Sequence, residues 1–199
     1  MEKSGMKTPL HIAFLVLAVL SLSNCGTGVA EIKRTKESQT GLLQDIHAPK
    51  KFTYRGQDYT PGYSAHGSNG AIVEYYKAGE GPNQWTSMLA VRRLDQPTTA
   101  EAQTKAMADR VSAKGLRFRS LINKKSGETT IDFMLPHSGD LEFNLFRYRP
   151  LANGQGVTSF QYIENIPKSR LRSFDGMAYT HKQRIAFFAL PFPYLSRTN

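Results

Sequence analysis

The chain has 199 residues, a formal net charge of +10 at pH 7 and a single cysteine. This length predicts one domain of ordinary size, and the single cysteine excludes an intrachain disulfide framework. The positive charges are scattered without a run of five or more, which favours an ordinary soluble surface over a polybasic segment for nucleic acid or acidic polymers.

An apolar run lies near the N-terminus, between Leu10 and Leu22, and Lys3 and Lys7 precede it. The run is shorter than the roughly 20 apolar residues that a membrane-spanning helix needs. A basic start, a short apolar core and an exit of small residues are typical of a secretory signal. We therefore predict an export signal over residues 1–24.

The residues that follow, Leu22-Ser23-Asn24-Cys25, resemble the lipobox of bacterial lipoproteins. This resemblance implies cleavage before Cys25, attachment of diacylglycerol to its sulfur and acylation of the new amino terminus. Asn24 replaces the Gly, Ala or Ser that is usual there, and Gly26 resembles the signals that sort lipoproteins to the outer membrane, facing the periplasm. The alternative is ordinary cleavage after Ala30, which would leave a soluble periplasmic or secreted protein without cysteine.

Residues 25–50 are mostly polar and charged, with little periodicity, and we predict that they form the lipidated N-terminus and a tether. A single folded domain is expected over residues 51–199. Apolar stretches separated by Gly and Pro predict its first strands over residues 51–55, 59–60, 71–76 and 85–94.

A helix is predicted over residues 98–114. Thr98 and Glu101 fit a capping box at its start, and Gly115 stands where a C-terminal cap belongs. Alternation of apolar and polar residues then predicts four more strands, over residues 116–120, 129–135, 140–149 and 157–164.

The last element is predicted to be a helix over residues 168–189. Apolar residues recur there every three or four positions, as on the inward face of a surface helix. This seam comprises Leu171, Phe174, Ala178, His181, Ile185 and Phe188. Taken together, the elements predict an α+β fold, an antiparallel β-sheet with two flanking helices packed on it.

Residues 71–95 read AIVEYYKAGEGPNQWTSMLAVRRLD, and they resemble a group of exported bacterial proteins thought to share the fold of PsbP and Mog1. The resemblance implies a PsbP/Mog1-like sandwich and a binding or accessory role, without a particular reaction. From its chemistry alone, Trp85 is expected to be a large core anchor at the start of a strand.

No motif for catalysis or metal binding is recognisable, since the sequence lacks H-E-x-x-H and G-x-S-x-G, and no cofactor or metal is expected. Ser64, Ser68, His66 and Asp58 crowd one stretch of the chain. They leave an exported hydrolase, with a site near residues 59–69, as an alternative.

A candidate anion-binding group consists of Arg117, Arg119, Arg147 and Arg149, which alternate along two predicted strands. Residues 143–150, FNLFRYRP, mix aromatic and basic side chains, as surfaces that bind single-stranded nucleic acid do. Sheet cores and charged edge strands have the same composition, so nucleic acid is not expected as a partner.

We therefore predict a membrane-anchored periplasmic lipoprotein, held by lipid on Cys25, which acts as a non-enzymatic binding or accessory module. A protein partner in the cell envelope is expected. The alternatives are an exported hydrolase and an anion- or nucleic-acid-binding module.

Overall fold

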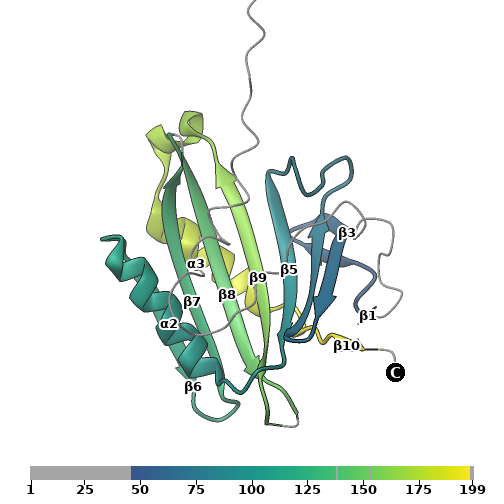
Figure 1. Cartoon of the computed structure of the whole chain (residues 1–199). Coiled ribbons are helices and arrows are strands. Elements are labelled where there is room, and N and C mark those ends of the chain that lie inside the picture. Colours follow the sequence, from purple (N-terminus) through teal and green to yellow (C-terminus); the bar gives the residue numbers. More distant parts are fainter. Residues whose placement is uncertain (1–45, 138, 153, 198–199) are drawn as a thin grey trace, which may run out of the picture. The chain divides into compact units, whose positions relative to one another are not determined.

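The computed structural model describes residues 46–137, 139–152 and 154–197. The predicted export signal, Cys25, the alternative cleavage site after Ala30 and the tether up to residue 45 lie outside these residues. Within the described part, an eight-stranded sheet runs in the order β2-β3-β4-β5-β9-β8-β7-β6, and β1 and β10 form a two-stranded sheet (Figure 1). The strands of the large sheet are β2 (Phe52–Tyr54), β3 (Gln57–Gly67), β4 (Gly70–Tyr76), β5 (Ser87–Leu94), β6 (Phe118–Asn123), β7 (Glu128–His137), β8 (Asp140–Pro150) and β9 (Val157–Ile166).

The prediction of an α+β, PsbP/Mog1-like sandwich with two flanking helices is wrong. Strands account for 48% of the described residues and helices for 22%, so the fold is β-rich, and three helices are present instead of two. They are α2 (Ala100–Ala113), the 3₁₀ helix η3 (Lys168–Ser173) and α3 (Gly176–Phe188). The sheet is antiparallel throughout, as expected.

The strands are longer than their apolar centres suggested, and β3 shows why. Pro61 and Gly62 were expected to break the chain, but a bulge between Pro61 and Tyr63 absorbs them and β3 continues for 11 residues. A Cβ atom at position 62 would lie 2.6 Å from Cδ2 of Tyr76, so only glycine lets the two strands approach this closely.

The helix expected over residues 168–189 is divided in two. Phe174 is extended, with φ −87° and ψ 109°, and it ends η3. The Asp175 carboxylate then accepts hydrogen bonds from the backbone N–H groups of Met177 and Ala178, at 3.0 Å each. An acidic N-cap of this kind starts a new helix, and α3 is therefore only 13 residues long.

After β5, the chain passes to the far edge of the sheet and then returns strand by strand to β5. After β5, helix α2 leads to the edge strand β6, and the meander β6-β7-β8-β9 then returns to pair with β5. Figure 1 shows α2 and α3 on opposite sides of the strands. We name the two faces by these helices: the α3 face carries Phe143, Leu145 and Phe160, and the α2 face carries Ile131, Phe133 and Phe146.

Helix α3 turns a different side inward from the predicted one. Phe187 and Gln183 are buried, and the Tyr54 hydroxyl donates a hydrogen bond of 2.6 Å to Oε1 of Gln183. Ile185 and Phe188, which belong to the predicted seam, are exposed. Apolar side chains occur on both sides of this helix, so spacing alone could not identify the inward side.

Strand β1 (Ile46–His47) pairs with β10 (Ser196–Arg197), and Ile46 is buried. Residues 46–50 therefore belong to the folded unit, which begins before the predicted boundary at residue 51. None of the helices in the described part of the chain is long and apolar enough to cross a membrane.

Candidate functional site

A connected row of polar side chains crosses the α2 face from β5 to β8. Arg92 on β5 donates a hydrogen bond to Oε1 of Gln161 on β9. Nε2 of Gln161 donates to Oδ1 of Asn144 on β8 at 3.0 Å, and Nδ2 of Asn144 donates to Oε1 of Glu142 at 2.7 Å. This polar row links a guanidinium at one end to a carboxylate at the other.

Strand register brings these side chains together. Gln161 lies between Ala90 of β5 and Phe146 of β8, and Arg92 and Asn144 are its diagonal neighbours. Diagonal neighbours in an antiparallel sheet are about 7–8 Å apart, which is within reach of long side chains. On its other side, Ala90 pairs with Glu74 of β4. Because the Ala90 side chain is small, it does not separate Gln161 from β4.

The polar row is buried in the sheet. Gln161 and Asn144 are 0% and 1% exposed, and Glu74 accepts a hydrogen bond from the Tyr76 hydroxyl. Burial of polar groups costs free energy unless hydrogen bonds replace those to water, and a connected network provides them. The row can therefore orient polar groups in fixed directions.

Sequence reasoning missed this row. Glu142 and Asn144 alternate with apolar residues in the same way that exposed residues do. The one signal in the sequence for this row was that several strands with long apolar stretches each also carry a polar residue. The register that connects them is set by the pairing of β8, β9 and β5, which is not local in sequence.

Burial raises the pKa of Glu142, and the hydrogen bond from Asn144 and the nearby His137 oppose this rise only in part. A carboxyl whose pKa is raised on folding favours the folded state at acidic pH, and this contribution is lost as the pH rises through the folded-state pKa. We expect Glu142→Gln, which keeps an oxygen that accepts from Asn144, to raise the melting temperature at pH 7 and to leave it nearly unchanged at pH 4. Thermal unfolding at the two pH values measures this, and an equal shift at both would contradict the assignment.

The four arginines of the predicted anion-binding group do not form one site. Arg147 is buried, and its Nε donates to Oε1 of Glu128 at 2.7 Å. Its Nη1 donates to the carbonyl oxygens of Phe187 and Leu190, at 3.0 Å each, so it satisfies carbonyls at the end of α3. Arg147 is thus a structural residue.

Arg149 binds the other oxygen of Glu128, with Nη2 at 2.7 Å, and its Nη1 donates to the Tyr194 hydroxyl at 3.1 Å. Burial alone would raise the pKa of Glu128, but the hydrogen bonds and charges of the two arginines outweigh it and lower the pKa. Arg117 and Arg119, in contrast, are exposed at the edge strand β6.

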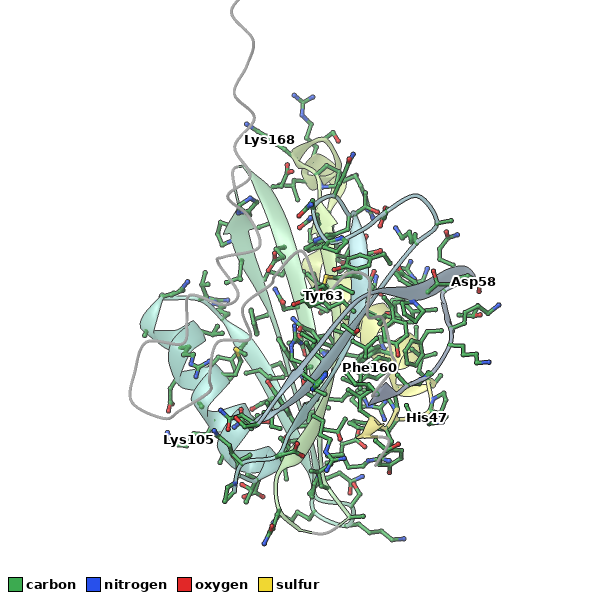
Figure 2. All side chains as sticks on the ribbon, turned by 45° about the vertical axis from the view of Figure 1, so that its right-hand side comes forward. His47, Asp58, Tyr63, Lys105, Phe160 and Lys168 are labelled. Atoms are coloured by element: carbon green, nitrogen blue, oxygen red, sulfur yellow. The ribbon has the colours of Figure 1, made fainter. Side chains whose placement is uncertain are left out.

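The residues suggested for a hydrolase are also separated. Ser64 and His66 lie on one side of β3 near its end, where they pair with Val73 and Ala71 of β4. Asp58 lies at the other end of β3, where Thr53 and Lys51 donate hydrogen bonds to it at 2.7 and 3.0 Å. Figure 2 shows Asp58 at the outer end of this hairpin, away from Tyr63. The structure therefore assembles no triad from these three residues.

A second carboxylate, Glu164 of β9, fastens the C-terminal helices to the sheet. The hydroxyls of Tyr162 and Tyr179 both donate to its Oε2, the first at 2.6 Å, and Arg170 of η3 donates to Oε1 at 3.2 Å. Burial, together with this carboxylate, raises the pKa of both tyrosines well above their usual value. The cluster therefore keeps neutral hydroxyls as hydrogen-bond donors at physiological pH.

Trp85 lies just before β5 and is half-buried against the cluster that contains Tyr63, Ile72 and Met88. It anchors the start of this strand, although it is less deeply buried than a central core residue. Within the described residues, no group of three or more His, Cys, Asp or Glu side chains could hold a metal ion.

Comparison with known proteins gives one match. No curated protein and no solved structure matches the chain. A protein-family model matches residues 46–188, from the start of β1 to the end of α3. No comparison relates the chain to PsbP or Mog1 proteins. The matched residues make up more than half of the chain, which therefore belongs to this family, a bacterial family of uncharacterised proteins.

Proposed function

We propose that the protein is a lipoprotein of the bacterial cell envelope, anchored by lipid on Cys25, and that its folded unit is a non-enzymatic binding module on the periplasmic side of the outer membrane. The observation that carries this proposal is the position of Cys25, three residues after the end of a short apolar run that lysines precede. Membership of a bacterial family supports it, because the lipobox is a bacterial signal.

The spacing between the cysteine and the fold suits an anchor. The first described strand begins at Ile46, 21 residues after Cys25, and the intervening sequence is mostly polar. An acylated Cys25 would hold the folded unit near a membrane without taking part in its core. Two or more acyl chains bind a protein to a bilayer stably, whereas one chain binds only reversibly.

Two of the buried carboxylates of the described fold, Asp132 and Glu128, have structural partners. Asp132 of β7 forms two hydrogen bonds with Arg184 of α3, at 2.6 and 2.8 Å, and Glu128 is paired with Arg147. The first pair joins α3 to the sheet, and the Arg147 of the second also binds carbonyl oxygens at the end of α3. General acid–base catalysis needs a carboxyl that can reach a substrate, and these groups are held inside the structure.

Metabolic labelling of cells with a palmitate analogue tests the anchor. The wild-type protein is expected to take up label, and Cys25→Ala is expected to lose it while the protein is still made. Asn24→Gly, which restores the usual lipobox residue, should be labelled at least as strongly as the wild type. An unlabelled wild-type protein whose amino terminus is Glu31 would show ordinary cleavage after Ala30 and would overturn the proposal.

A further inference from the structure

The outward side of α3 exposes large apolar side chains. Met177, Ile185 and Phe188 are 84%, 60% and 39% exposed. With 3.6 residues per turn, these three positions fall within about 80° of one another, on a different side of the helix from the buried Gln183 and Phe187. A helix that presents apolar side chains both inward and outward has a second surface to cover.

The same surface continues onto the edge strand β6. Arg119 pairs with Asp132 of β7, which in turn binds Arg184 of α3. Leu121, which is 46% exposed, lies one step further along β6 on the same face.

Arg147 provides the second link between β6 and α3. Leu121 pairs with Thr130, Thr130 pairs with Arg147, and the Arg147 guanidinium lies 5.2 Å from the centre of the Phe188 ring. The exposed side chains of α3 and β6 are therefore neighbours on the α3 face. We call them the α3–β6 surface, defined by the apolar residues Leu121, Met177, Ile185 and Phe188 and the exposed basic residues Arg117, Arg119 and Lys182.

The charged residues that define this surface are all basic, and Asp175, the N-cap of α3, precedes Met177 by two residues. The chain has no Asp or Glu between residues 176 and 197. The acidic residues beneath the surface are neutralised, because Asp132 is paired with Arg184 and Glu128 with Arg147 and Arg149. The remaining charges of Arg117, Arg119 and Lys182 are therefore not balanced by these carboxylates.

An apolar stripe flanked by lysine and arginine is the pattern of helices that lie in the interface of an anionic bilayer. Anionic lipid headgroups attract such basic residues, and the apolar side chains enter the boundary between headgroups and acyl chains. Tyr194 lies close by, bonded to Arg149 and 57% exposed, and tyrosine is enriched at this depth.

We propose that the α3–β6 surface docks the folded unit on a membrane that contains anionic lipid, with α3 parallel to the bilayer plane. The charge complementarity of the surface identifies the occupant. The inference rests on the described residues and does not depend on lipidation of Cys25. Docking can therefore be observed when palmitate labelling fails, and labelling can succeed when docking is absent.

A local fluorescence probe tests the docking in the full chain. Trp85→Phe removes the only tryptophan, and Ile185→Trp then places a probe on the α3–β6 surface. The matched control is Lys105→Trp, which places the probe on α2, beyond the opposite face of the sheet; the Lys105 side chain is 76% exposed. Far-UV circular dichroism verifies the fold of each variant. Probe emission and its quenching by brominated lipid are read with vesicles of phosphatidylcholine alone and with added phosphatidylglycerol.

We expect the probe at position 185 to shift to shorter wavelength and to be quenched at least about twofold more strongly than the probe at position 105, with anionic vesicles only. The shift should shrink at about 1 M salt, where the screening length falls to roughly 3 Å. Adding Arg119→Glu and Lys182→Glu should abolish it.

Several results would overturn the proposal. One is equal emission with neutral and anionic vesicles, which would show that the N-terminal apolar run alone brings the chain to lipid. Another is equal quenching of the two probes. A shift that appears without vesicles and grows with protein concentration would identify a second copy of the chain as the occupant.

Discussion

Arg147→Ala is expected to destabilise the folded unit by about 3–5 kcal/mol, because removing one partner of a buried ion pair leaves the other charge uncompensated. The Arg147 side chain is 6% exposed and Glu128 10%. The substitution also removes the hydrogen bonds to the carbonyl oxygens of Phe187 and Leu190. Arg149 would still bind Glu128, so we expect the lower part of this range.

Thermal or urea unfolding of the full chain measures the effect of Arg147→Ala. A loss of this size should lower the melting temperature by about 10 °C, since 1 kcal/mol corresponds to roughly 2–4 °C for a chain of this length. Arg119→Ala is the matched control, because Arg119 is exposed on β6 and surface substitutions usually change stability by less than about 0.5 kcal/mol. If both variants unfold like the wild type, Arg147 does not hold the end of α3.

Phe187→Ala should have a comparable effect, about 3–5 kcal/mol, because it opens a cavity in a closely packed aromatic cluster. Phe187 is 0% exposed, and its ring centre lies 4.5 Å from that of Phe160 and 6.0 Å from that of Tyr54. This cluster joins α3 to β9 and β2, so the loss should be visible in equilibrium unfolding of the whole unit.

Phe188→Ala is the control for that substitution, since the two positions differ by one residue. Phe188 is more than one third exposed and packs against the Arg147 guanidinium, a contact of about 0.5–1 kcal/mol. Its loss should therefore cost much less than that of Phe187. If Phe188→Ala were the more destabilising of the two substitutions, Phe188 would point inward, as the sequence predicted.

Elements whose signals are local were predictable from the sequence. The strand expected over residues 71–76 is β4, and the helix expected over residues 98–114 is α2, whose N-cap lies one residue later than the predicted cap. The hydroxyl of Thr99, not Thr98, accepts the hydrogen bond from the N–H of Ala102. Propensity and alternation act over a few residues, so they can be recognised in the sequence without knowing the partner strands.

The features that were mispredicted depend on contacts between distant segments. The number of helices was underestimated because Asp175 starts a new helix inside a stretch that looks continuous. The role of Arg147 depends on Glu128 and on the end of α3, which are 19 and 40 residues away in sequence. The resemblance to PsbP and Mog1 proteins covered one strand, a loop and the next strand, and a segment of that length does not determine how many helices cover a sheet.

Of the candidate sites, the sequence revealed the residue types but not their grouping. Arg117 and Arg119 are exposed, but so is every residue of β6, so alternation did not identify an inward side of this strand. Lys182 lies more than 60 residues further along the chain, and only the packing of α3 against β7 brings it to the same surface. The polar row could not be predicted for the same reason. Its members become neighbours only when β9 pairs with β5.

The pairing of β1 with β10 makes the fold a candidate for circular permutation. Ile46 and Arg197 are direct partners in this ladder, and paired Cα atoms in antiparallel strands are about 4.5–5.5 Å apart. A short linker could therefore join these two positions covalently, and new ends could be opened in the exposed turn between β6 and β7. In such a molecule, β1, which now follows the segment from Cys25, would lie inside the chain and connect to β10. An anchor could then be attached at another point of the surface.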